Sequence, residues 1–434
     1  MSERESRVEG GVRASWSLLR RNRDFRNLYA ASIISLGGDW FLLVPLWGLL
    51  LELTDSSIVV ALSFAAQDVP FFLASPIGGA LADRIDRRKL MVACDLARAV
   101  LCLGFLLIRD AGTVWIAFPL LAVLSSFSAA FDPASSAALP NVVDDEDLAT
   151  ANVLSGSLWG TMLVIGAMAG GIAAGVLGRD AAFLIDAASF AASGVLIWRI
   201  RRSFSEERPE KHPGIVRATG ETVRYARRDH RVLALLGVKT GFGLGAGGVL
   251  VLISVFATKV FHGGDGMIGL LMSARGVGAL VGPFLGRRLL GQRDRRLFFV
   301  IGLSLMTFGV GYTLFGLAPT VMVAAPLLVL AHLGGGAQWA ISSYGLQRVV
   351  PDRIRGRIFA FDGALLTLTF AISGLLSGWA AEHVGIRITA IAFGVVAIVW
   401  AAVWTLATTD VRRATMLEGC GGPPPEPESE AASA

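Results

Sequence analysis

Long apolar blocks, separated by short polar segments, run through almost the whole chain. A helix needs roughly 20 mostly apolar residues to cross the hydrocarbon core of a bilayer. Blocks of this kind occur at 28–51, 58–82, 90–108, 113–131, 148–177, 182–200, 232–257, 266–286, 296–316, 319–345, 358–380 and 386–408. The pattern predicts an all-α membrane protein with twelve transmembrane helices.

The composition agrees with this fold class. Of 434 residues, 54% are hydrophobic and only 17% are charged. A soluble chain of this length would need enough charge to cover two or three domains. Cys94, Cys102 and Cys420 are far apart, so neither a disulfide framework nor a metal site is expected. The polar N-terminal segment 1–27 lacks the short apolar core of a signal peptide.

Lysine and arginine alternate between connecting segments. They are dense in 1–27, 84–89, 199–231, 287–296 and 353–357, and absent from the turns after the first and ninth spans. The positive-inside rule therefore predicts a bacterial inner-membrane protein with both termini in the cytoplasm. Nucleic acid is not an expected partner, because the basic residues lie in loops and form no single face. One loop breaks the rule: DPASSAALPNVVDDEDLATAN is acidic where a basic loop is expected.

The chain also divides into two similar halves. GGALADRIDRRKL at 78–90 follows the second span, and GRRLLGQRDRRLF at 286–298 follows the eighth. Two parallel six-helix repeats are typical of carriers that expose a central site alternately to the two membrane faces. The predicted parts are a cytoplasmic N-terminus (1–27), a first bundle (28–200), a cytoplasmic linker with a basic amphipathic helix (201–231), a second bundle (232–410) and a disordered tail (411–434).

The first of these loops resembles the signature of the major facilitator superfamily, G-x-x-x-D-R-x-G-R-R/K. The matching positions are Gly79, Asp83, Arg84, Arg87 and Arg88, and Asp86 stands where the signature often has glycine. FDPASSAALPNVVDDEDLATAN, AFLIDAASFAASG and LQRVVPDRIRGRI are similar to the branch with enterobactin-type siderophore exporters and macrolide efflux proteins. The resemblance implies the major facilitator fold in a monomeric carrier that needs no cofactor and is not an enzyme.

The signature loop is a candidate cytoplasmic gate. Its glycine, Gly79, permits close helix approach, and Asp83 can accept hydrogen bonds from a helix N-terminus or an arginine. The arginines can bridge to the other half and lock the cytoplasmic side shut in the outward-facing state, with Asp362 in the eleventh span as the expected partner of Arg84. The alternative is that the arginines only fix topology.

Small residues mark the fifth span. GAMAGGIAAG resembles a degenerate form of the superfamily's antiporter motif, which lines the interface of the halves. Gly166, Gly170 and Gly175 match, whereas Gly171 replaces a proline. Generic small-residue packing is the alternative.

Two aspartates lie near the middle of apolar spans. Asp39 is in the first span and Asp68 in the second, where Pro70 frees a backbone carbonyl. Ionisable residues inside the membrane are costly and usually functional. A desolvated carboxyl group binds its proton more tightly than one in water, so either aspartate is a candidate for proton coupling. The alternative is permanent pairing, for which Lys239, Arg275 and His332 are the available partners.

The substrate cavity is predicted from the family resemblance and from aromatic residues. The resemblance implies that the first, fourth, seventh and tenth spans line it. Aromatic rings there would bind an amphipathic organic molecule by stacking and burial. The resulting candidates are Trp40, Lys239, Phe242, His332 and Trp339. Asp95 and Arg98 share a helix face and are expected to pair structurally.

Export of a bulky organic compound, such as a siderophore, antibiotic or drug-like molecule, in exchange for protons is the leading hypothesis. Proton-coupled uptake of a nutrient or lipid-like solute is the alternative. No G-x-x-x-x-G-K-[ST] motif occurs, which weighs against an ATP-driven pump. A membrane enzyme or sensor would need clustered catalytic groups, but the five histidines are scattered.

Overall fold

The computed structural model describes residues 14–202, 204, 224–291 and 296–411, without the side chains of Asp83, Ala149, Asp352, Arg353 and Gly356. Within these ranges the chain is helical, and twelve helices are long and apolar enough to cross a membrane. The predicted linker helix and C-terminal tail fall largely outside the described residues.

The first six spanning helices are α2 (Arg23–Thr54), α3 (Ser57–Arg84), α4 (Arg87–Gly104), α5 (Ala117–Val142), α6 (Asp145–Leu177) and α7 (Arg179–Trp198). The second six are α9 (His230–Val255), α10 (Asp265–Leu290), α11 (Leu297–Leu317), α12 (Val321–Val349), α13 (Asp352–His383) and α14 (Ile386–Ala407). Polar caps start several of them. The side chains of Asn22, Ser56 and Asp86 each accept a hydrogen bond from a backbone N–H in the first turn of α2, α3 and α4.

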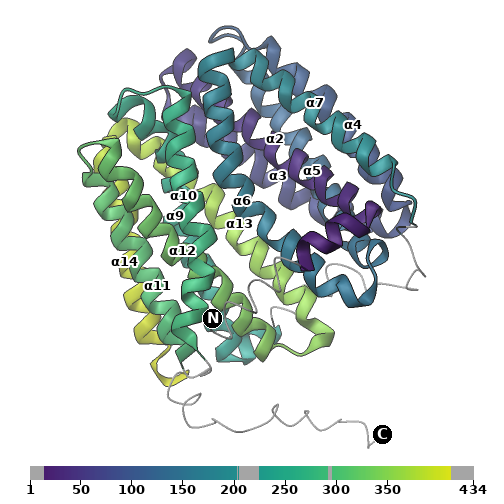
Figure 1. Ribbon diagram of the computed structural model, residues 1–434. Helices are drawn as coiled ribbons and strands as arrows, with labels where there is room; N and C mark the ends of the chain where they lie inside the picture. The colour runs from purple at the N-terminus through teal and green to yellow at the C-terminus, as the bar shows by residue number, and fades with distance from the viewer. Residues whose placement is uncertain (1–13, 203, 205–223, 292–295, 412–434) are drawn as a thin grey trace, which may run out of the picture.

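The two sets of helices pack in the same order. In the first half α2 contacts α6 and α7, α3 contacts α5, and α4 contacts α5 and α7. In the second half α9 contacts α13 and α14, α10 contacts α12, and α11 contacts α12 and α14. Each pair in one half has its counterpart six spans later, so the predicted two-repeat fold is confirmed. The halves meet along α6 with α10 and α3 with α13, between the two groups seen in Figure 1.

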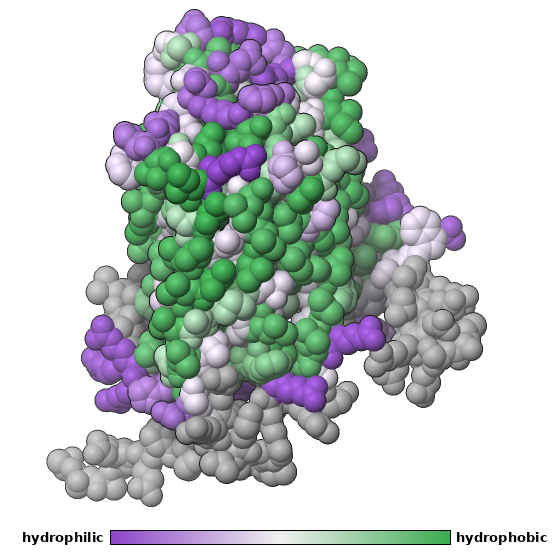
Figure 2. Space-filling model, turned by 90° about the vertical axis from the view of Figure 1, so that its left-hand side faces the viewer, coloured by the Kyte–Doolittle hydropathy of each residue, from purple (hydrophilic) through white to green (hydrophobic). Residues whose placement is uncertain are grey.

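Because consecutive spanning helices alternate in direction, their connections lie on two sides. The terminal side holds the start of α2, the end of α14 and the connections 85–86, 143–144 and 350–351. The far side holds the connections 55–56, 108–113, 178, 261–264, 318–320 and 384–385. Between these sides the surface is apolar, and Figure 2 shows a hydrophobic belt with hydrophilic residues at both ends. Exposed side chains such as Val176, Phe284 and Leu406 belong to this apolar surface, which suits a lipid environment.

The fourth span is longer than the sequence pattern predicts. The expected limit was residue 131, but α5 continues to Val142 and makes most of the FDPASS segment helical. Ala134 and Ala138, both fully buried, continue the packed face of the helix. Packing therefore outweighs the breaking tendency of Pro133 and Pro140.

The acidic loop that departs from the positive-inside rule is paired with basic residues. Asp147 forms an ion pair with Arg21, and Asp144 forms one with Arg202 at 3.0 Å. Asp24 accepts hydrogen bonds from the backbone N–H groups of Arg201 and Arg202 at 3.2 and 3.0 Å. The loop thus lies within a mixed-charge cluster on the terminal side, so its acidity does not require an odd number of spans.

Candidate functional site

A cavity of about 530 Å³ lies on the inner face of the first half. Volumes of this size hold drug-sized ligands. Its lining comes from α2, α5 and α6, with Arg98 from α4: Phe25, Leu28, Tyr29, Ser32, Ser35, Leu36, Asp39, Arg98, Ser128, Phe131, Asp132, Ser135, Ser136, Leu139, Asn152, Ser155, Gly156, Leu158 and Trp159. It extends from Asp39, midway along α2, to residues near the terminal-side ends of the helices.

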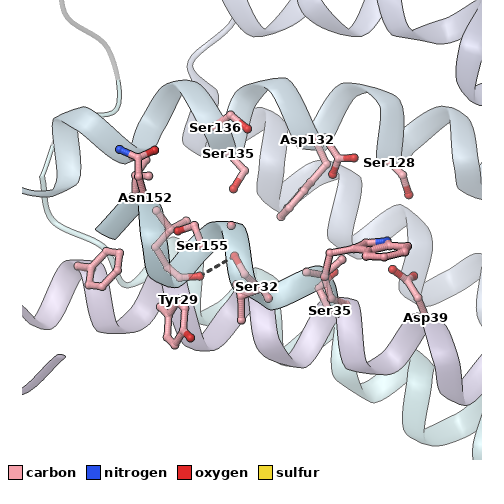
Figure 3. Close-up of a pocket in the computed structure, with 18 of the residues that line it drawn as sticks. Tyr29, Ser32, Ser35, Asp39, Ser128, Asp132, Ser135, Ser136, Asn152 and Ser155 are labelled. Atoms are coloured by element: carbon pink, nitrogen blue, oxygen red, sulfur yellow. Dashed lines mark hydrogen bonds between the residues drawn. The ribbon is translucent and has the colours of Figure 1, made fainter. Parts of the chain in front are cut away.

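Helical spacing explains why these residues share one wall. On α2 the lining positions recur every three or four residues from Phe25 to Asp39, and on α5 they do so from Ser128 to Leu139. Residues at this spacing form a stripe along one side of a helix. In Figure 3, Asp39 on α2 and Asp132 on α5 lie on opposite walls near one end, whereas Asn152 lies near the other end. Ser32, Ser35, Ser135 and Ser155 lie along the walls between these two ends.

Arg98 is held by its own partners. It forms a buried ion pair with Asp95, as its spacing predicts, and Ser193 Oγ donates to Asp95 at 2.7 Å. The guanidinium carbon lies 4.5 Å from the ring centroid of Phe131 and 4.4 Å from that of Phe190. Arg98 is only 2% exposed. The prediction that Asp95 and Arg98 pair is therefore confirmed, and the charge of Arg98 is balanced within the protein.

Asp186 is a further buried carboxylate behind the cavity. It accepts hydrogen bonds from Cys102 Sγ at 3.1 Å and from Ser189 Oγ at 3.3 Å. Gly38 makes room for this group, because a Cβ there would stand 2.4 Å from Asp186 Oδ1. Asp186 also lies close enough to Asp39 for electrostatic interaction. It therefore contributes negative potential without lining the cavity.

Asp39 and Asp132 differ from these paired groups. Within the described part of the chain, neither carboxylate accepts a hydrogen bond or forms an ion pair, and the two are close enough to interact electrostatically. Asp39 is conspicuous in the sequence because it interrupts an apolar block, whereas Asp132 lies just beyond the block that ends at residue 131. The spacing of Ser128, Asp132, Ser135 and Ser136 is the signal that reveals the polar stripe.

The second proton-coupling candidate, Asp68, lies on α3 and is partly buried. It is not among the residues that line the cavity. The structure therefore brings one of the two predicted aspartates to the cavity and leaves the other outside it.

The five other predicted cavity residues do not line this cavity. Lys239 Nζ donates to Asp362 Oδ2 at 2.5 Å and to Ser343 Oγ at 3.0 Å, and it lies 4.7 Å from the centroid of Trp339. Phe242 packs against Phe308 with centroids 4.7 Å apart.

The remaining two of these five residues lie in packed regions. His332 is buried, and its Nε2 lies 2.6 Å from Tyr312 Oη. Trp40 packs against Gly166 and Gly170 of α6. In this conformation Lys239 and His332 contact Asp362 and Tyr312, so neither is the permanent partner of Asp39 or Asp68 that the alternative required.

The predicted partner of Arg84 has another partner. Asp362 is 1% exposed and paired with Lys239, while Arg84 is exposed on the terminal side. The predicted Arg84–Asp362 pair is thus absent from this conformation. The side chain of Asp83 lies outside the described residues.

The other two arginines of the signature loop hold the start of the linker. Arg87 donates to the carbonyl oxygens of Ala137 at 2.9 Å and Phe204 at 3.0 Å. Arg88 donates to the carbonyl of Arg202 at 2.5 Å, and its guanidinium carbon lies 5.2 Å from the ring centroid of Phe204. Both arginines therefore bind their own half here.

The close helix approach expected at Gly79 occurs one residue earlier. A Cβ on Gly78 would stand 2.3 Å from the carbonyl oxygen of Ala129 on α5, whereas a Cβ on Gly79 would meet nothing within 4 Å. The prediction for Gly79 is wrong because a helix turns each successive residue by about 100°, so only Gly78 faces α5.

Ion pairs join the halves on the far side. Arg179 at the start of α7 donates to Glu52 of α2 at 2.6 Å and to Asp265 of α10 at 2.8 Å. Lys259 pairs with Asp55 at 2.8 Å. Glu382 at the end of α13 accepts hydrogen bonds from Ser56 Oγ at 2.5 Å and from the backbone N–H of Ile58 at 3.1 Å. These contacts close the far side, so the cavity extends toward the terminal side.

The glycines of α6 contact two different neighbours. Gly166 and Gly170 face α2 in the same half, which corrects the expectation that they line the interface of the halves. Gly171 faces the other half: a Cβ there would stand 2.6 Å from the carbonyl oxygen of Asp265 and 3.1 Å from Gly269 Cα. A Cβ on Gly175 would meet nothing within 4 Å. Thus Gly171, which replaces the proline of the motif, makes the close crossing with α10.

Gly171→Ala is expected to separate α6 from α10 and lower stability by about 1–3 kcal/mol, the usual cost of overpacking. Apparent melting temperatures in detergent test this expectation. Gly175→Ala is the matched control, four residues along the same helix, and should leave the melting temperature unchanged. Equal melting temperatures for the two variants would contradict the close crossing.

A two-half helical membrane protein with a polar cavity and inter-half ion pairs has the architecture of an alternating-access carrier. The chain belongs to the major facilitator superfamily, and the family described as transmembrane secretion effector matches residues 13–418.

Two relatives match along most of their length. The chain is 24% identical over 372 residues to macrolide efflux protein A of Streptococcus pyogenes, covering 84% of this chain and 90% of that protein. It is 23% identical over 380 residues to the multidrug efflux pump Tap of Mycolicibacterium fortuitum, covering 83% and 90%.

Solved structures share the fold. A bacterial homologue of the human lysosomal transporter Spinster, in an inward-facing and unoccupied conformation, superposes with a TM-score of 0.70 at 16% identity, covering 93% of this chain and all of that one. A POT family transporter in complex with 5-aminolevulinic acid gives a TM-score of 0.73 at 12% identity, covering 90% and 97%. Because the matching family and the named relatives are transporters and not enzymes, the protein is a transporter and not an enzyme.

Proposed function

We propose that this protein exports a bulky organic compound from the cytoplasm in exchange for protons. The observation that carries the proposal is the cavity with Asp39 midway across the membrane-spanning region and no partner for its carboxylate among the described residues. A carboxylate in that position can hold a proton in one conformation and release it in the other. The matched relatives include proteins named for macrolide and multidrug efflux, which supports the outward direction.

The orientation follows from charge. The terminal side carries arginines in three places: the signature loop, the segment after α7 and the start of α13. By the positive-inside rule, this side faces the cytoplasm in a bacterial inner membrane. In that orientation the closed far side faces outward and the cavity extends toward the cytoplasm. A monomer contains both halves and the whole cavity, so a single chain surrounded by lipid is the proposed unit.

Everted membrane vesicles test the proposal. Respiration acidifies their lumen, and adding a macrolide such as erythromycin should drive protons out as the drug enters. Asp39→Asn is expected to abolish this drug-dependent proton efflux, because an amide cannot carry the exchanged proton. A pH-sensitive dye records the proton efflux, and labelled drug records accumulation.

Asp68→Asn is the matched control, because it also removes a membrane aspartate but lies outside the cavity. It should retain most of the exchange. Drug accumulation that persists after an uncoupler collapses the proton gradient would exclude proton coupling. Drug movement out of the vesicle lumen, driven by the same gradient, would favour the alternative of uptake.

A further inference from the structure

We propose that the transported compound is an organic cation and that Asp132 is the residue that recognises its charge. The inference rests on the proposed function in one respect, since it takes the cavity as the place where the cargo binds. It is carried by the balance of charge along the cavity wall and by the position of Asp132 across from Asp39 (Figure 3).

The charges that line the cavity do not cancel. Among the described lining residues, Asp39 and Asp132 are acidic and Arg98 is basic. Arg98 is already neutralised by Asp95, which lies behind the wall. Two carboxylates without an ion-pair partner are therefore left facing the same space. A cavity of low dielectric strength that bears surplus negative charge favours a cation over a neutral or anionic molecule of the same shape.

Arg98 is also poorly placed to attract an anion. Its guanidinium group lies between the rings of Phe131 and Phe190, and it is 2% exposed. An anionic cargo would have to break the pair with Asp95 and leave that buried carboxylate without its counter-charge, which is costly. The charge of Arg98 acts on both Asp39 and Asp132, but Asp95 already balances it, so a net negative charge remains along the wall.

Asp132 and Asp39 differ in access. Asp132 is exposed to the cavity, whereas Asp39 is only partly exposed and lies within electrostatic range of Arg98, Asp186 and Asp95. The more accessible carboxylate is the one that an entering cation meets without displacing protein groups. This division leaves Asp39 to exchange the proton while Asp132 holds the charge of the cargo.

The rest of the lining suits the body of an organic cation. Trp159 is 53% exposed and lines the cavity together with Tyr29, and its ring centroid lies 5.8 Å from the guanidinium carbon of Arg275. Phe25 and Phe131 are buried in the wall. Exposed aromatic surface stacks on the apolar rings of a ligand. Six serines in the lining offer hydrogen bonds that tolerate many substituents. A metal ion would need several convergent oxygen ligands, and no such cluster of metal-binding residues occurs among the described residues.

Binding of three probes with similar aromatic bodies and different charges tests the inference. Tetraphenylphosphonium is the cation, triphenylphosphine oxide the neutral compound and tetraphenylborate the anion. Calorimetry uses the full-length protein in lipid nanodiscs, with empty nanodiscs as the blank for partitioning into lipid. The wild type should bind tetraphenylphosphonium at least tenfold more tightly than either of the other probes.

Asp132→Asn should weaken binding of tetraphenylphosphonium at least tenfold and leave binding of triphenylphosphine oxide unchanged. Asp132→Glu should restore most of the loss, because it returns the charge. Asp110→Asn removes an exposed carboxylate from a far-side turn and should change neither affinity. Unchanged binding of the neutral probe also shows that the Asn variant is folded.

The inference is overturned if the wild type fails to bind tetraphenylphosphonium, binds the neutral or anionic probe as tightly, or loses no affinity in Asp132→Asn. An equal loss for the charged and neutral probes would assign Asp132 a structural role and overturn it as well. Binding is measured without a proton gradient, so its outcome is independent of transport. Selective cation binding without drug–proton exchange in vesicles would leave the inference standing and reject the proposed function.

Discussion

Lys239→Met is expected to destabilise the protein by about 3–5 kcal/mol, the usual cost of removing one partner of a buried ion pair. Lys239 is 5% exposed and Asp362 is 1% exposed, and the lysine donates to the carboxylate at 2.5 Å. Asp362 Oδ1 already lacks a hydrogen bond. Without Lys239 the whole carboxylate would be buried without a counter-charge.

The double variant Lys239→Met/Asp362→Leu tests whether the instability of Lys239→Met comes from the unpaired carboxylate of Asp362. Replacing both charges with apolar groups of similar size removes the cost of the orphaned charge, so the double variant should recover most of the stability. Thermal unfolding in detergent can be followed with a thiol-reactive dye, because Cys94 and Cys102 are buried in the fold. Cys420→Ser in every variant removes the signal of the third cysteine.

Transport by the double variant decides what the pair does. A structural pair predicts that drug–proton exchange persists once stability is restored. If the double variant is stable but exchanges no protons, Asp362 or Lys239 takes part in coupling and Asp39 does not act alone. If it is as unstable as Lys239→Met, an orphaned carboxylate is not the cause of the instability.

Arg179→Gln is expected to shift the protein toward a conformation open on the far side by a factor of ten or more. Arg179 donates from α7 to Glu52 in its own half and to Asp265 in the other half, and it is the bridge between them. Asp265 is 7% exposed and lies directly against Gly48, where a Cβ would stand only 1.7 Å from its carboxylate oxygen.

The magnitude follows from the hydrogen bonds that are lost. A hydrogen bond to a charged group contributes about 1.5–3 kcal/mol. A difference of about 1.4 kcal/mol changes a two-state equilibrium tenfold. Two such bonds to Asp265 would disappear in the glutamine variant. The conformation open on the far side should therefore gain at least tenfold in population relative to the closed one.

Spin labels on far-side turns of the two halves measure this shift. Ala111→Cys in the first half and Thr320→Cys in the second are exposed positions for labels in a cysteine-free background. Arg179→Gln should add a population at longer distance. Arg109→Gln is the matched control, because it breaks an exposed far-side pair with Asp180 inside one half. An unchanged distance distribution in Arg179→Gln, or the same shift in the control, would contradict the role of the bridge.

The candidate site was only partly predictable from the sequence. Asp39 stood out because a carboxylate in the middle of an apolar block is costly. Asp132 did not, since Pro133 and the acidic residues after it resemble a loop in the sequence, whereas α5 continues to Val142 with Ala134 and Ala138 buried. The predicted Arg84–Asp362 pair is absent from this conformation, in which Asp362 pairs with Lys239.

The sequence by itself determined the twelve spans, their repetition and the local pairing of Asp95 with Arg98. Those features depend on block length, on backbone hydrogen bonds made within each span and on spacing along one helix. Only the tertiary structure decided that Asp132 faces the cavity with Asp39, that Gly78 and not Gly79 contacts α5, and that Arg179 bridges to Asp265. The physical reason is that spacing along one helix determines which residues share a face. How each helix is rotated about its axis, and which helices it contacts, depends on packing between residues far apart in the chain.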